Sequence, residues 1–309
     1  MVNDVSPSDE PETTDADGPE PAAAFAVLGS ETRLRILREL WESDDRPLGF
    51  STLRARVGMR DPGQFAYHLN RLVGPYVTKS DDGYDIRMAG VNVVWAVVSG
   101  ELTPGAESKT FPATGDCEDC GGPLRARYED ELFYVECADC GRGYSMAPFP
   151  PSGFVDRTEQ EVLVAFDRRS RPIYEQVVHD VCPRCAGHGT VSLVDDDADR
   201  RAGEPDPSQY EALAVRFRCD VCGLWASERV DVLLTHNDRV AAFHRDNGVD
   251  LEEVPIWLRP RRVDANAELR ATRPLSFRVR YTAGAATLEL VADETLAIDA
   301  DSMVESGDG

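Results

Sequence analysis

Residues 117–140 read CEDCGGPLRARYEDELFYVECADC, with a Cys-x-x-Cys pair at each end. Two runs of alternating apolar residues, 124–128 and 132–136, flank an acidic turn at 129–131. This pattern predicts a β-hairpin that brings the two cysteine pairs together. Four thiolate ligands in a tetrahedron are what a structural zinc ion prefers. The stretch therefore predicts a four-cysteine zinc site on a hairpin, which is a zinc ribbon.

A second stretch, residues 182–222, follows the same plan. Strands are expected at 190–194 and 212–218, joined by an acidic loop at 195–208. The two stretches hold all eight cysteines of the chain: Cys117, Cys120, Cys137, Cys140, Cys182, Cys185, Cys219 and Cys222. We expect two closed, structural zinc ions, because four cysteines leave no coordination position open for catalysis. His179 and His188 lie near the second quartet and could replace a cysteine, but surface histidines are the better interpretation.

Glycines accompany the cysteine pairs. Gly121, Gly141 and Gly223 directly follow three pairs, and Gly187 follows the remaining pair one residue later. Backbone N–H groups must turn toward the sulfur atoms in such a site, so we expect these glycines to supply a positive φ.

Two alternatives to zinc are disulfides and a redox dithiol. Residues 1–24 are acidic and proline-rich, so a secretory signal is not expected. The most apolar stretch, residues 91–98, is too short to span a bilayer. We therefore expect a cytoplasmic protein that does not enter a membrane, and disulfides rarely persist in the cytosol. A thioredoxin-like dithiol uses one Cys-x-x-Cys pair, whereas this chain has four.

The charge of the chain is strongly negative. Its 309 residues include 56 acidic and 33 basic side chains, which give a net charge of −23, and the only lysines are Lys79 and Lys109. This composition resembles proteins of halophiles that accumulate salt, haloarchaea above all. At about 1 M salt the Debye length is only about 3 Å, so self-repulsion is largely screened. Counterion release then adds little to nucleic-acid binding, and contacts to bases and to DNA shape must contribute more.

Helical patterns dominate the region from residue 22 to residue 99. The expected elements are a helix at 22–28, helices capped by Ser30, Ser51 and Asp61, strands at 76–80 and 84–87, and a helix at 89–99. In the second helix Leu34, Leu37 and Trp41 recur at helical spacing, and together with Ile36 and Leu40 they predict an apolar face. Residues 1–21 hold too few apolar groups to fold, so we expect a disordered acidic tail there.

This order of elements resembles the ArsR-like winged helix-turn-helix regulators common in haloarchaea. Residues 28–37 (LGSETRLRIL) are similar to the opening helix pair of that family, residues 64–69 (QFAYHL) to its recognition helix, and residues 79–84 (KSDDGY) to its wing. The resemblance covers about residues 22–105, a third of the chain. It implies a domain that binds double-stranded DNA, and we expect a homodimer through the helix at 89–99. No cysteine lies in this region, which argues against the heavy-metal sensing of many ArsR repressors.

The recognition helix of a helix-turn-helix lies in the major groove of DNA. Phe65, Leu69 and Leu72 form its expected apolar face, so the opposite face is available to DNA. Glutamine can bond adenine, and arginine can bond guanine or a phosphate. The expected DNA-binding residues are Arg60, Gln64, Tyr67, His68, Arg71 and Lys79. The acidic pair at residues 81–82, at the tip of the wing, argues against deep insertion of the wing.

The region after the first cysteine quartet contains further elements. Thr158 and Glu161 form a capping box, which opens an amphipathic helix that runs toward Val178. Pro172 is expected to kink or split this helix. A short helix at 238–247 and a hairpin with strands at 277–281 and 287–291 are also expected. A ribbon followed by a helix occurs twice, which suggests a diverged internal repeat.

The expected fold class is α+β: an N-terminal winged helix-turn-helix, two four-cysteine zinc-ribbon modules with accessory helices, and a C-terminal β-hairpin. The expected domains are a disordered tail (1–21), the DNA-binding domain (22–108), the first ribbon with its helix (112–180), the second ribbon with its helix and hairpin (181–300), and a disordered tail (301–309).

These features predict a sequence-specific transcriptional regulator, whose zinc ribbons brace a dimer or bind a protein partner or an effector. The alternative is a basal transcription factor that contacts RNA polymerase, because a winged helix joined to a zinc ribbon also resembles the archaeal general initiation factor E. An enzyme is not expected. The sequence shows no Ser-His-Asp arrangement, phosphate-binding loop, dinucleotide fingerprint or His-x-Glu motif.

Overall fold

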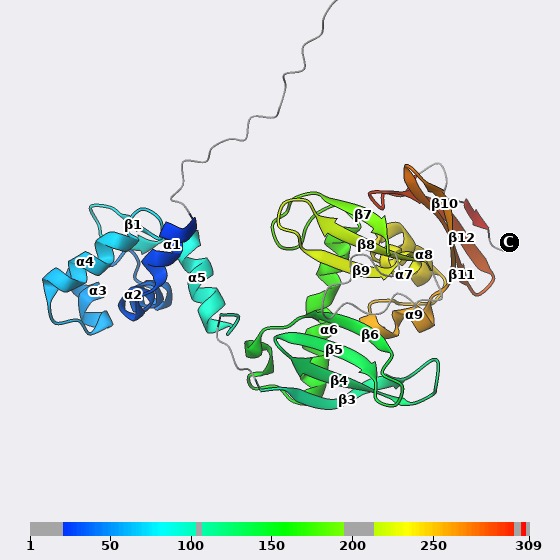
Figure 1. The fold of residues 1–309 in the computed structure, drawn as a ribbon, viewed down its shortest axis with the longest axis horizontal. Helices are drawn as coiled ribbons and strands as arrows, with labels where there is room; N and C mark the ends of the chain where they lie inside the picture. Colours follow the sequence, from blue (N-terminus) through cyan, green and yellow to red (C-terminus); the bar gives the residue numbers. More distant parts are fainter. Residues whose placement is uncertain (1–20, 103–106, 195–212, 300–303, 307–309) are drawn as a thin grey trace, which may run out of the picture. The chain divides into compact units, whose positions relative to one another are not determined.

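The computed structural model describes residues 21–102, 107–194, 213–299 and 304–306 (Figure 1). The chain divides into two compact units, with the boundary between Leu102 and Thr103. The expected acidic loop at 195–208 lies outside the described residues, as do both expected tails except for Pro21 and residues 304–306. No helix among the described residues has both the length and the apolar character needed to cross a membrane.

The first unit consists of helices and one small hairpin. Its elements are α1 (Pro21–Leu28), α2 (Glu31–Glu42), α3 (Phe50–Val57), α4 (Pro62–Leu72), β1 (Val77–Lys79), β2 (Tyr84–Ile86) and α5 (Met88–Val98). The two strands pair antiparallel, with Val77 opposite Ile86. This order of helices and strands agrees with the expected order.

Helix α2 lies at the centre of the first unit and contacts α3, α4, α5 and β2. Its fully buried residues are Ile36, Leu37 and Leu40. All three belong to the expected apolar face, and its other two members, Leu34 and Trp41, are half-buried. Neighbours on several sides of α2 therefore bury a wide stripe of the helix.

The N-cap positions agree with the sequence in two cases of three, and a side-chain capping hydrogen bond forms in one of them. The carboxylate of Asp61 accepts a hydrogen bond from the backbone N–H of Gln64 at 2.9 Å and caps α4. Ser30 occupies the N-cap of α2, but its side chain makes no capping hydrogen bond. Ser51 is not a cap, since α3 begins one residue earlier after Gly49. The earlier start places Phe50 in the helix, where its ring packs edge-on against Phe65 at 5.0 Å between centroids.

The second unit contains three antiparallel sheets (Figure 1). The first sheet consists of β3 (Lys109–Asp116), β4 (Pro123–Glu129), β5 (Leu132–Cys137) and β6 (Gly143–Pro148). The second consists of β7 (Gly189–Leu193), β8 (Ala214–Cys219) and β9 (Trp225–Arg229). The third consists of β10 (Asp264–Thr272), β11 (Leu275–Ala283), β12 (Ala286–Asp293) and β13 (Val304–Ser306). The expected strand pairs β4–β5, β7–β8 and β11–β12 are confirmed, whereas β3, β6, β9, β10 and β13 were not expected.

Helical segments connect and cover these sheets. They are η1 (Pro151–Phe154), α6 (Glu159–Val177), α7 (Val230–Leu233), η3 (Leu234–His236), α8 (Asp238–Asp246), η4 (Ile256–Leu258) and α9 (Arg259–Arg262). The capping box of Thr158 and Glu161 is confirmed, with both reciprocal hydrogen bonds present. Helix α6 continues through Pro172, so of the expected kink or split the split does not occur. Buried contacts on both sides of Pro172, at Phe166 and Val177, outweigh the one backbone hydrogen bond that proline removes.

The two cysteine-bearing sheets belong to one unit. Phe166 in the first half of α6 packs with Phe133 of the first sheet at 4.4 Å between ring centroids. Val177 at the end of the same helix lies in the core that contains Val215 of the second sheet. Trp257, far along the chain, donates its indole N–H to the backbone oxygen of Thr114 in β3 at 3.0 Å. These contacts cross residue 180, where the sequence analysis divides the chain, and the structure shows no separation there.

Candidate metal centres and nucleic-acid interface

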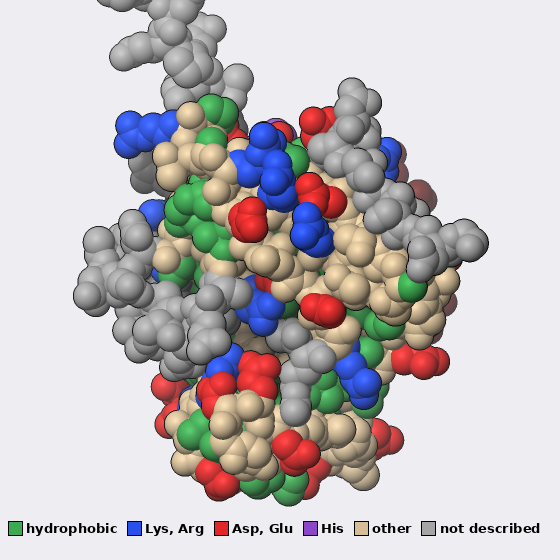
Figure 2. Space-filling view, turned by 90° about the vertical axis from the view of Figure 1, so that its right-hand side faces the viewer, with side chains coloured by type: hydrophobic (Ala, Val, Ile, Leu, Met, Phe, Trp, Pro, Cys, Tyr) green, Lys and Arg blue, Asp and Glu red, His purple; other side chains and the backbone are tan. Residues whose placement is uncertain are grey.

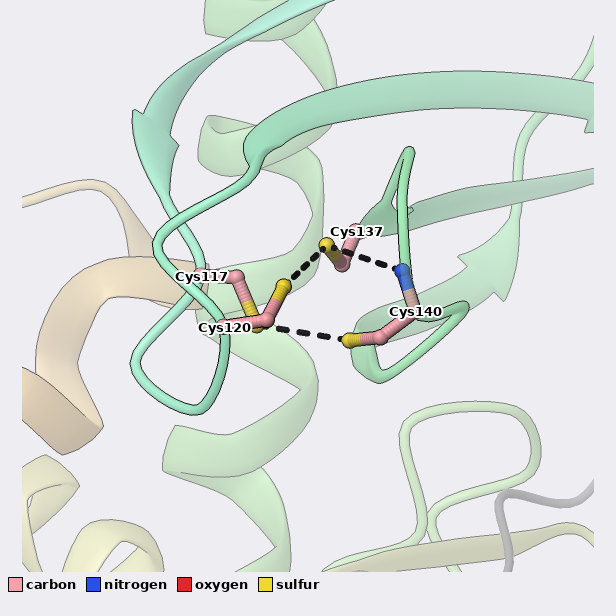
Figure 3. A group of neighbouring side chains, drawn as sticks. All are labelled: Cys117, Cys120, Cys137 and Cys140. Atoms are coloured by element: carbon pink, nitrogen blue, oxygen red, sulfur yellow. Dashed lines mark hydrogen bonds between the residues drawn. The ribbon is translucent and has the colours of Figure 1, made fainter.

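The first cysteine quartet lies where two tight turns meet at one end of the first sheet. One turn joins β3 to β4 and carries Cys117 and Cys120, and the other joins β5 to β6 and carries Cys137 and Cys140. Figure 3 shows the four side chains pointing toward one another. Their sulfur atoms all lie within 4.8 Å of one another. The Cys117–Cys140 and Cys120–Cys137 sulfur distances are 3.6 Å and 3.5 Å.

The second quartet has the same geometry. The sulfur atoms of Cys182 and Cys222 are 3.6 Å apart, and those of Cys185 and Cys219 are 3.5 Å apart. A disulfide needs about 2.05 Å between sulfur atoms, and all eight cysteines are free. A tetrahedron of thiolates around zinc, with Zn–S bonds of about 2.3 Å, places the sulfur atoms about 3.8 Å apart. Both quartets therefore have the geometry of a four-thiolate metal site, and the disulfide interpretation does not fit.

The turns that carry the cysteines repeat one hydrogen-bond pattern. The backbone N–H of Cys117 donates to the oxygen of Gly122 at 2.7 Å, and that of Cys182 donates to the oxygen of Gly187 at 2.9 Å. In the second turn of each site, the backbone N–H groups of Cys137 and Cys219 each donate the equivalent hydrogen bond, at 2.8 Å in both cases. The two sites are thus copies of one local structure, which supports the internal repeat.

Three of the four turns place a glycine at positive φ, as expected, at Gly121, Gly141 and Gly223. In the remaining turn the expectation for Gly187 is wrong, because the positive φ, +59°, belongs to Ala186. Gly187 is needed for another reason. A Cβ atom at this position would lie 2.8 Å from the Val221 side chain and 3.3 Å from the sulfur of Cys185.

The protein environment lowers the pKa of the buried cysteines Cys117, Cys137 and Cys219 and raises that of the exposed cysteines Cys120, Cys140 and Cys185. Hydrogen bonds from the backbone N–H groups of Cys222 and Val221 lower the pKa of Cys219 to about 6. Burial opposes ionisation of Cys117, but hydrogen bonds from the Tyr144 hydroxyl and from the backbone lower its pKa to about 6. Thiolate is the form that binds a metal, so Cys117 and Cys219 are the cysteines that the protein itself prepares for metal binding.

In the first site an aromatic side chain, Tyr144, supports one of the cysteine turns. The Tyr144 hydroxyl accepts a hydrogen bond from the backbone N–H of Glu118 at 2.8 Å and donates one to the sulfur of Cys117 at 3.3 Å. Arg142 lies over the Tyr144 ring and forms ion pairs with Glu118 and Asp119. Tyr144 does not stand out in the sequence, since nothing in the local pattern shows that it reaches back to the first turn.

The expected DNA-binding residues lie on the surface of the first unit. Gln64, Tyr67 and Arg71 are exposed on α4, on the side opposite the buried residues Phe65, Leu69 and Leu72. The Arg71 guanidinium lies 5.6 Å from the centre of the Tyr67 ring. These three side chains therefore form one continuous face of α4. The helix itself is about 16 Å long.

The other expected residues lie around that face. His68 is half-buried, and its Nδ1 atom is enclosed without a hydrogen-bond partner. Arg60 is exposed in the turn before α4, and Lys79 is exposed at the end of β1, 5.8 Å from the Tyr84 ring centre. Within the described part of the chain, Arg60, Arg71 and Lys79 form no ion pair with an acidic side chain, so their charges are not neutralised there.

The local charge of the first unit differs from that of the whole chain. Residues 46–80 contain six basic side chains and one acidic side chain, in a chain of 56 acidic and 33 basic residues. Two of the six, Arg54 and Arg56, lie on α3. Arg54 donates to the backbone oxygen of Arg60 at 3.1 Å and holds the turn between α3 and α4. Counting charge in short windows would have found these arginines.

Comparison with known families gives two matches. The model of a family described as a domain of unknown function, DUF7351, matches residues 114–298, more than half of the chain. The chain belongs to this family. A second model, described as a domain of unknown function, DUF7347, matches residues 21–97.

The DUF7351 segment contains both cysteine quartets and lies within the second unit, whereas the DUF7347 segment lies within the first. No curated protein and no solved structure matches the chain.

Proposed function

We propose that this protein is a sequence-specific, DNA-binding transcriptional regulator with two structural zinc ions. In this proposal the first unit is a winged helix-turn-helix of the ArsR-like type, α4 is the recognition helix, and the β1–β2 hairpin is the wing. The protein works in the cytoplasm at high salt. The observation that carries the proposal is the exposed face of Gln64, Tyr67 and Arg71 on a helix whose other side is buried.

The shape and charge of α4 support this role. The major groove of B-DNA is about 12 Å wide and admits an α-helix. Gln64 lies near the N-terminal end of α4, where recognition helices contact base edges. Arg71 lies in the last turn, where a guanidinium can reach a phosphate. The basic segment 46–80 offers phosphate contacts in a chain that otherwise repels DNA.

Zinc is the metal that best fits the eight cysteines. A closed set of four thiolates selects zinc or an iron–sulfur cluster, and each quartet converges on a volume that a single tetrahedral ion fills. Because each ion has four protein ligands, its role is to stabilise the turns of the second unit. The two cysteine-bearing sheets are then zinc ribbons. The ribbons are then available to bind a protein partner.

A second copy of the chain is the partner that α1 and α5 fit. Neither helix contains a charged residue, so a chain of net charge −23 can approach its own copy there with little repulsion. Met88, Trp95 and Leu102 follow one another at intervals of seven residues, and each is more than half exposed. Phe25 of α1 is 74% exposed. A homodimer would cover this apolar surface and present two copies of α4 to a palindromic site.

Selection of bound sequences from a random pool of duplex DNA tests the proposal with the full chain in molar KCl. We expect one enriched motif, and we expect Gln64→Ala to relax the preference at one position of it. The proposal fails if no motif emerges, or if Gln64→Ala selects the same motif with the same stringency. Co-purification of RNA polymerase without a preferred motif would favour the basal-factor alternative.

A further inference from the structure

Charge is unevenly distributed in the first unit. Residues 21–102 contain ten basic and ten acidic side chains, so the described part of this unit has no net charge. Six of the ten basic side chains lie in the segment 46–80, whose one acidic residue is Asp61. The carboxylate of Asp61 already accepts the N-cap hydrogen bond from the backbone of Gln64. The segment 46–80 is therefore a positive area on a neutral unit.

Three cations of this segment form what we call the basic face: Arg60, Arg71 and Lys79. Arg60 is exposed just before α4, and Arg71 is exposed in the last turn of that helix. Lys79 ends β1, whose first residue, Val77, accepts a hydrogen bond from the backbone N–H of Gly74 at 2.9 Å, just after α4. The basic face therefore extends along α4 from one end to the other.

Most charges on the surface have a partner of opposite sign nearby. Arg46 lies 3.5 Å from the carboxylate of Asp85, and Arg56 lies 3.9 Å from that of Asp45. On the side of the molecule that Figure 2 shows, acidic and basic side chains are interspersed and neither forms a continuous area. Within residues 21–102, by contrast, no acidic side chain pairs with the three cations of the basic face. An anionic partner of this face must come from elsewhere.

Residues 1–20, which we call the acidic segment, supply such a partner within the same chain. The acidic segment contains no basic side chain and has a charge of −7, from Asp4, Asp9, Glu10, Glu12, Asp15, Asp17 and Glu20. It directly precedes Pro21, the first residue of α1. Opposite charge and direct attachment to the same unit therefore favour a contact between the acidic segment and the basic face.

Tyr76 fixes the point from which the acidic segment starts. Its hydroxyl donates a hydrogen bond to the backbone oxygen of Ala24 in α1 at 3.1 Å, and its backbone N–H donates to the oxygen of Leu72 at the end of α4 at 3.0 Å. Pro21 is one helical turn before Ala24, and Lys79 is three residues after Tyr76, so Pro21 lies within about 30 Å of Lys79. The acidic segment spans up to about 66–72 Å when fully extended, which exceeds this distance.

Covalent attachment favours the acidic segment over a second copy of the chain as the occupant of the basic face. A segment tethered close to its target has an effective concentration on the order of 1 mM, without any additional contact. A second copy, with a net charge of −23, would bring further acidic surface toward an acidic chain and meet repulsion. The chain's own segment meets no such cost.

We propose that the acidic segment binds the basic face of its own chain and competes with duplex DNA for it. The contact depends only on charge and attachment, whereas the competition rests on the DNA-binding function proposed above. DNA binds only the molecules whose basic face is open, so the apparent affinity falls with the open fraction. Salt screens the ion pairs, so the open fraction rises with KCl concentration. The acidic segment therefore suppresses non-specific DNA binding at low salt, where such binding is tightest, and releases the face in molar salt.

Carbodiimide crosslinking of the full chain tests the contact directly, because this reagent joins a carboxylate to an amine only where the two groups touch. Lys79 and Lys109 are the only lysines of the chain, and both are exposed. We expect mass spectrometry to find the acidic segment joined to Lys79, and far less to Lys109, which lies in the second unit. The yield at Lys79 should fall when KCl is raised and when duplex DNA is added.

Two arginine variants provide a matched control for the crosslink. Arg71→Gln removes a cation of the basic face and should lower the yield at Lys79. Arg38→Gln removes the same charge from α2, where the guanidinium pairs with Glu42 at 2.7 Å, and should leave the yield unchanged. Thermal melting shows at which KCl concentrations each variant is folded. Equal yields at the two lysines, a yield at Lys79 that does not fall with salt, or Lys79 crosslinks found only in covalent dimers would overturn the proposal.

Fluorescence anisotropy with a labelled duplex of about 20 base pairs tests the competition over a series of KCl concentrations. Neutralising six acids of the acidic segment should tighten binding about 3- to 150-fold at the lowest salt, as expected for the loss of three exposed ion pairs. The difference should disappear toward molar KCl. The six substitutions are Asp9→Asn, Glu10→Gln, Glu12→Gln, Asp15→Asn, Asp17→Asn and Glu20→Gln.

The control for this experiment neutralises six acids of residues 195–208, far from the acidic segment in sequence, and should leave DNA affinity close to that of the wild type. Its substitutions are Asp195→Asn, Asp196→Asn, Asp197→Asn, Asp199→Asn, Glu204→Gln and Asp206→Asn. Equal gains in the two sextuple variants would mean that net charge governs the affinity, which overturns the competition. If no form of the protein binds duplex DNA, the proposed function fails, and the crosslink to Lys79 still decides whether the acidic segment binds the basic face.

Discussion

The guanidinium of Arg259 lies 3.0 Å from Nε2 of His236, and both side chains are buried in the second unit. Arginine can only donate hydrogen bonds, so the facing nitrogen of His236 must be unprotonated. The Tyr174 ring packs against the imidazole, with 5.3 Å between ring centroids. Burial, followed by the charges of Arg259 and Arg171, holds the pKa of His236 well below its usual range.

This pair predicts that the second unit loses stability in mild acid. A depressed folded-state pKa means that the stabilisation is complete above the unfolded pKa, about 6.5, and is lost as pH falls below it. One such histidine lowers the free energy of unfolding by up to about 1.4 kcal/mol for each pH unit of acidification. His236→Gln keeps an acceptor for Arg259 but cannot take up a proton, so thermal unfolding of this variant between about pH 7 and pH 5 should depend less on pH. Equal slopes for the variant and the wild type would contradict this role, and His179→Gln, at an exposed position, is the control.

The two metal sites should be separable by single substitutions. Cys137→Ser should lower the metal content from two zinc ions per chain to one, as measured by native mass spectrometry, because three thiolates no longer close the tetrahedron. Structural zinc contributes on the order of 10 kcal/mol of folding free energy, so the first ribbon should melt. The first unit should stay folded, since it contains no metal ligand. Two ions retained in Cys137→Ser would show that the quartets are paired wrongly.

Tyr144 should affect the first metal site and not the second. Tyr144→Phe removes the hydroxyl that links the Glu118 N–H to the sulfur of Cys117. Loss of such a supporting contact lowers metal affinity about 10- to 100-fold. Competition with a chromogenic chelator should therefore show one zinc ion released more readily and one unchanged. Tyr134→Phe, whose ring stacks on Arg127 away from the cysteines, should behave as the wild type does.

A comparison of two equivalent turns isolates the effect of backbone strain. Ala186 holds φ at +59°, whereas the matching residue of the first site is Gly121 at +74°. The left-handed conformation costs a residue with a Cβ atom roughly 1–2 kcal/mol relative to glycine. Ala186→Gly should therefore raise the melting temperature by about 2–4 °C, because about 1 kcal/mol shifts a unit of this size by that amount. Gly121→Ala should lower the melting temperature by a similar amount. The cost comes from the left-handed φ alone, because a Cβ atom there meets no other atom within 4 Å. A destabilised Ala186→Gly variant would show that φ does not limit this turn.

The parts of the fold that follow from local pattern were predictable, and the parts that depend on distant contacts were not. The spacing of Cys117 to Cys140 and the capping box of Thr158 and Glu161 act within one turn or one hairpin. Strand β3 contains Pro112 and Gly115, which weaken a strand pattern, and Trp257 contacts it from 143 residues away. Tyr144 and Ala186 show the same limit within the metal sites, because their roles depend on where the chain turns back.

Lys79 provides the test that distinguishes a phosphate contact from a base contact in the proposed DNA interface. It is exposed at the end of β1 and has no acidic partner in the described part of the chain. If it meets a phosphate, Lys79→Ala should weaken binding to all duplexes alike and reduce the slope of log affinity against log salt by about 0.9. Gln64→Ala should instead change sequence preference and leave the slope intact. Arg38→Ala on α2, whose guanidinium pairs with Glu42 at 2.7 Å, removes the same charge and should alter neither quantity. A slope that falls equally in Lys79→Ala and Arg38→Ala would mean that net charge, and not contact at the wing, governs the affinity.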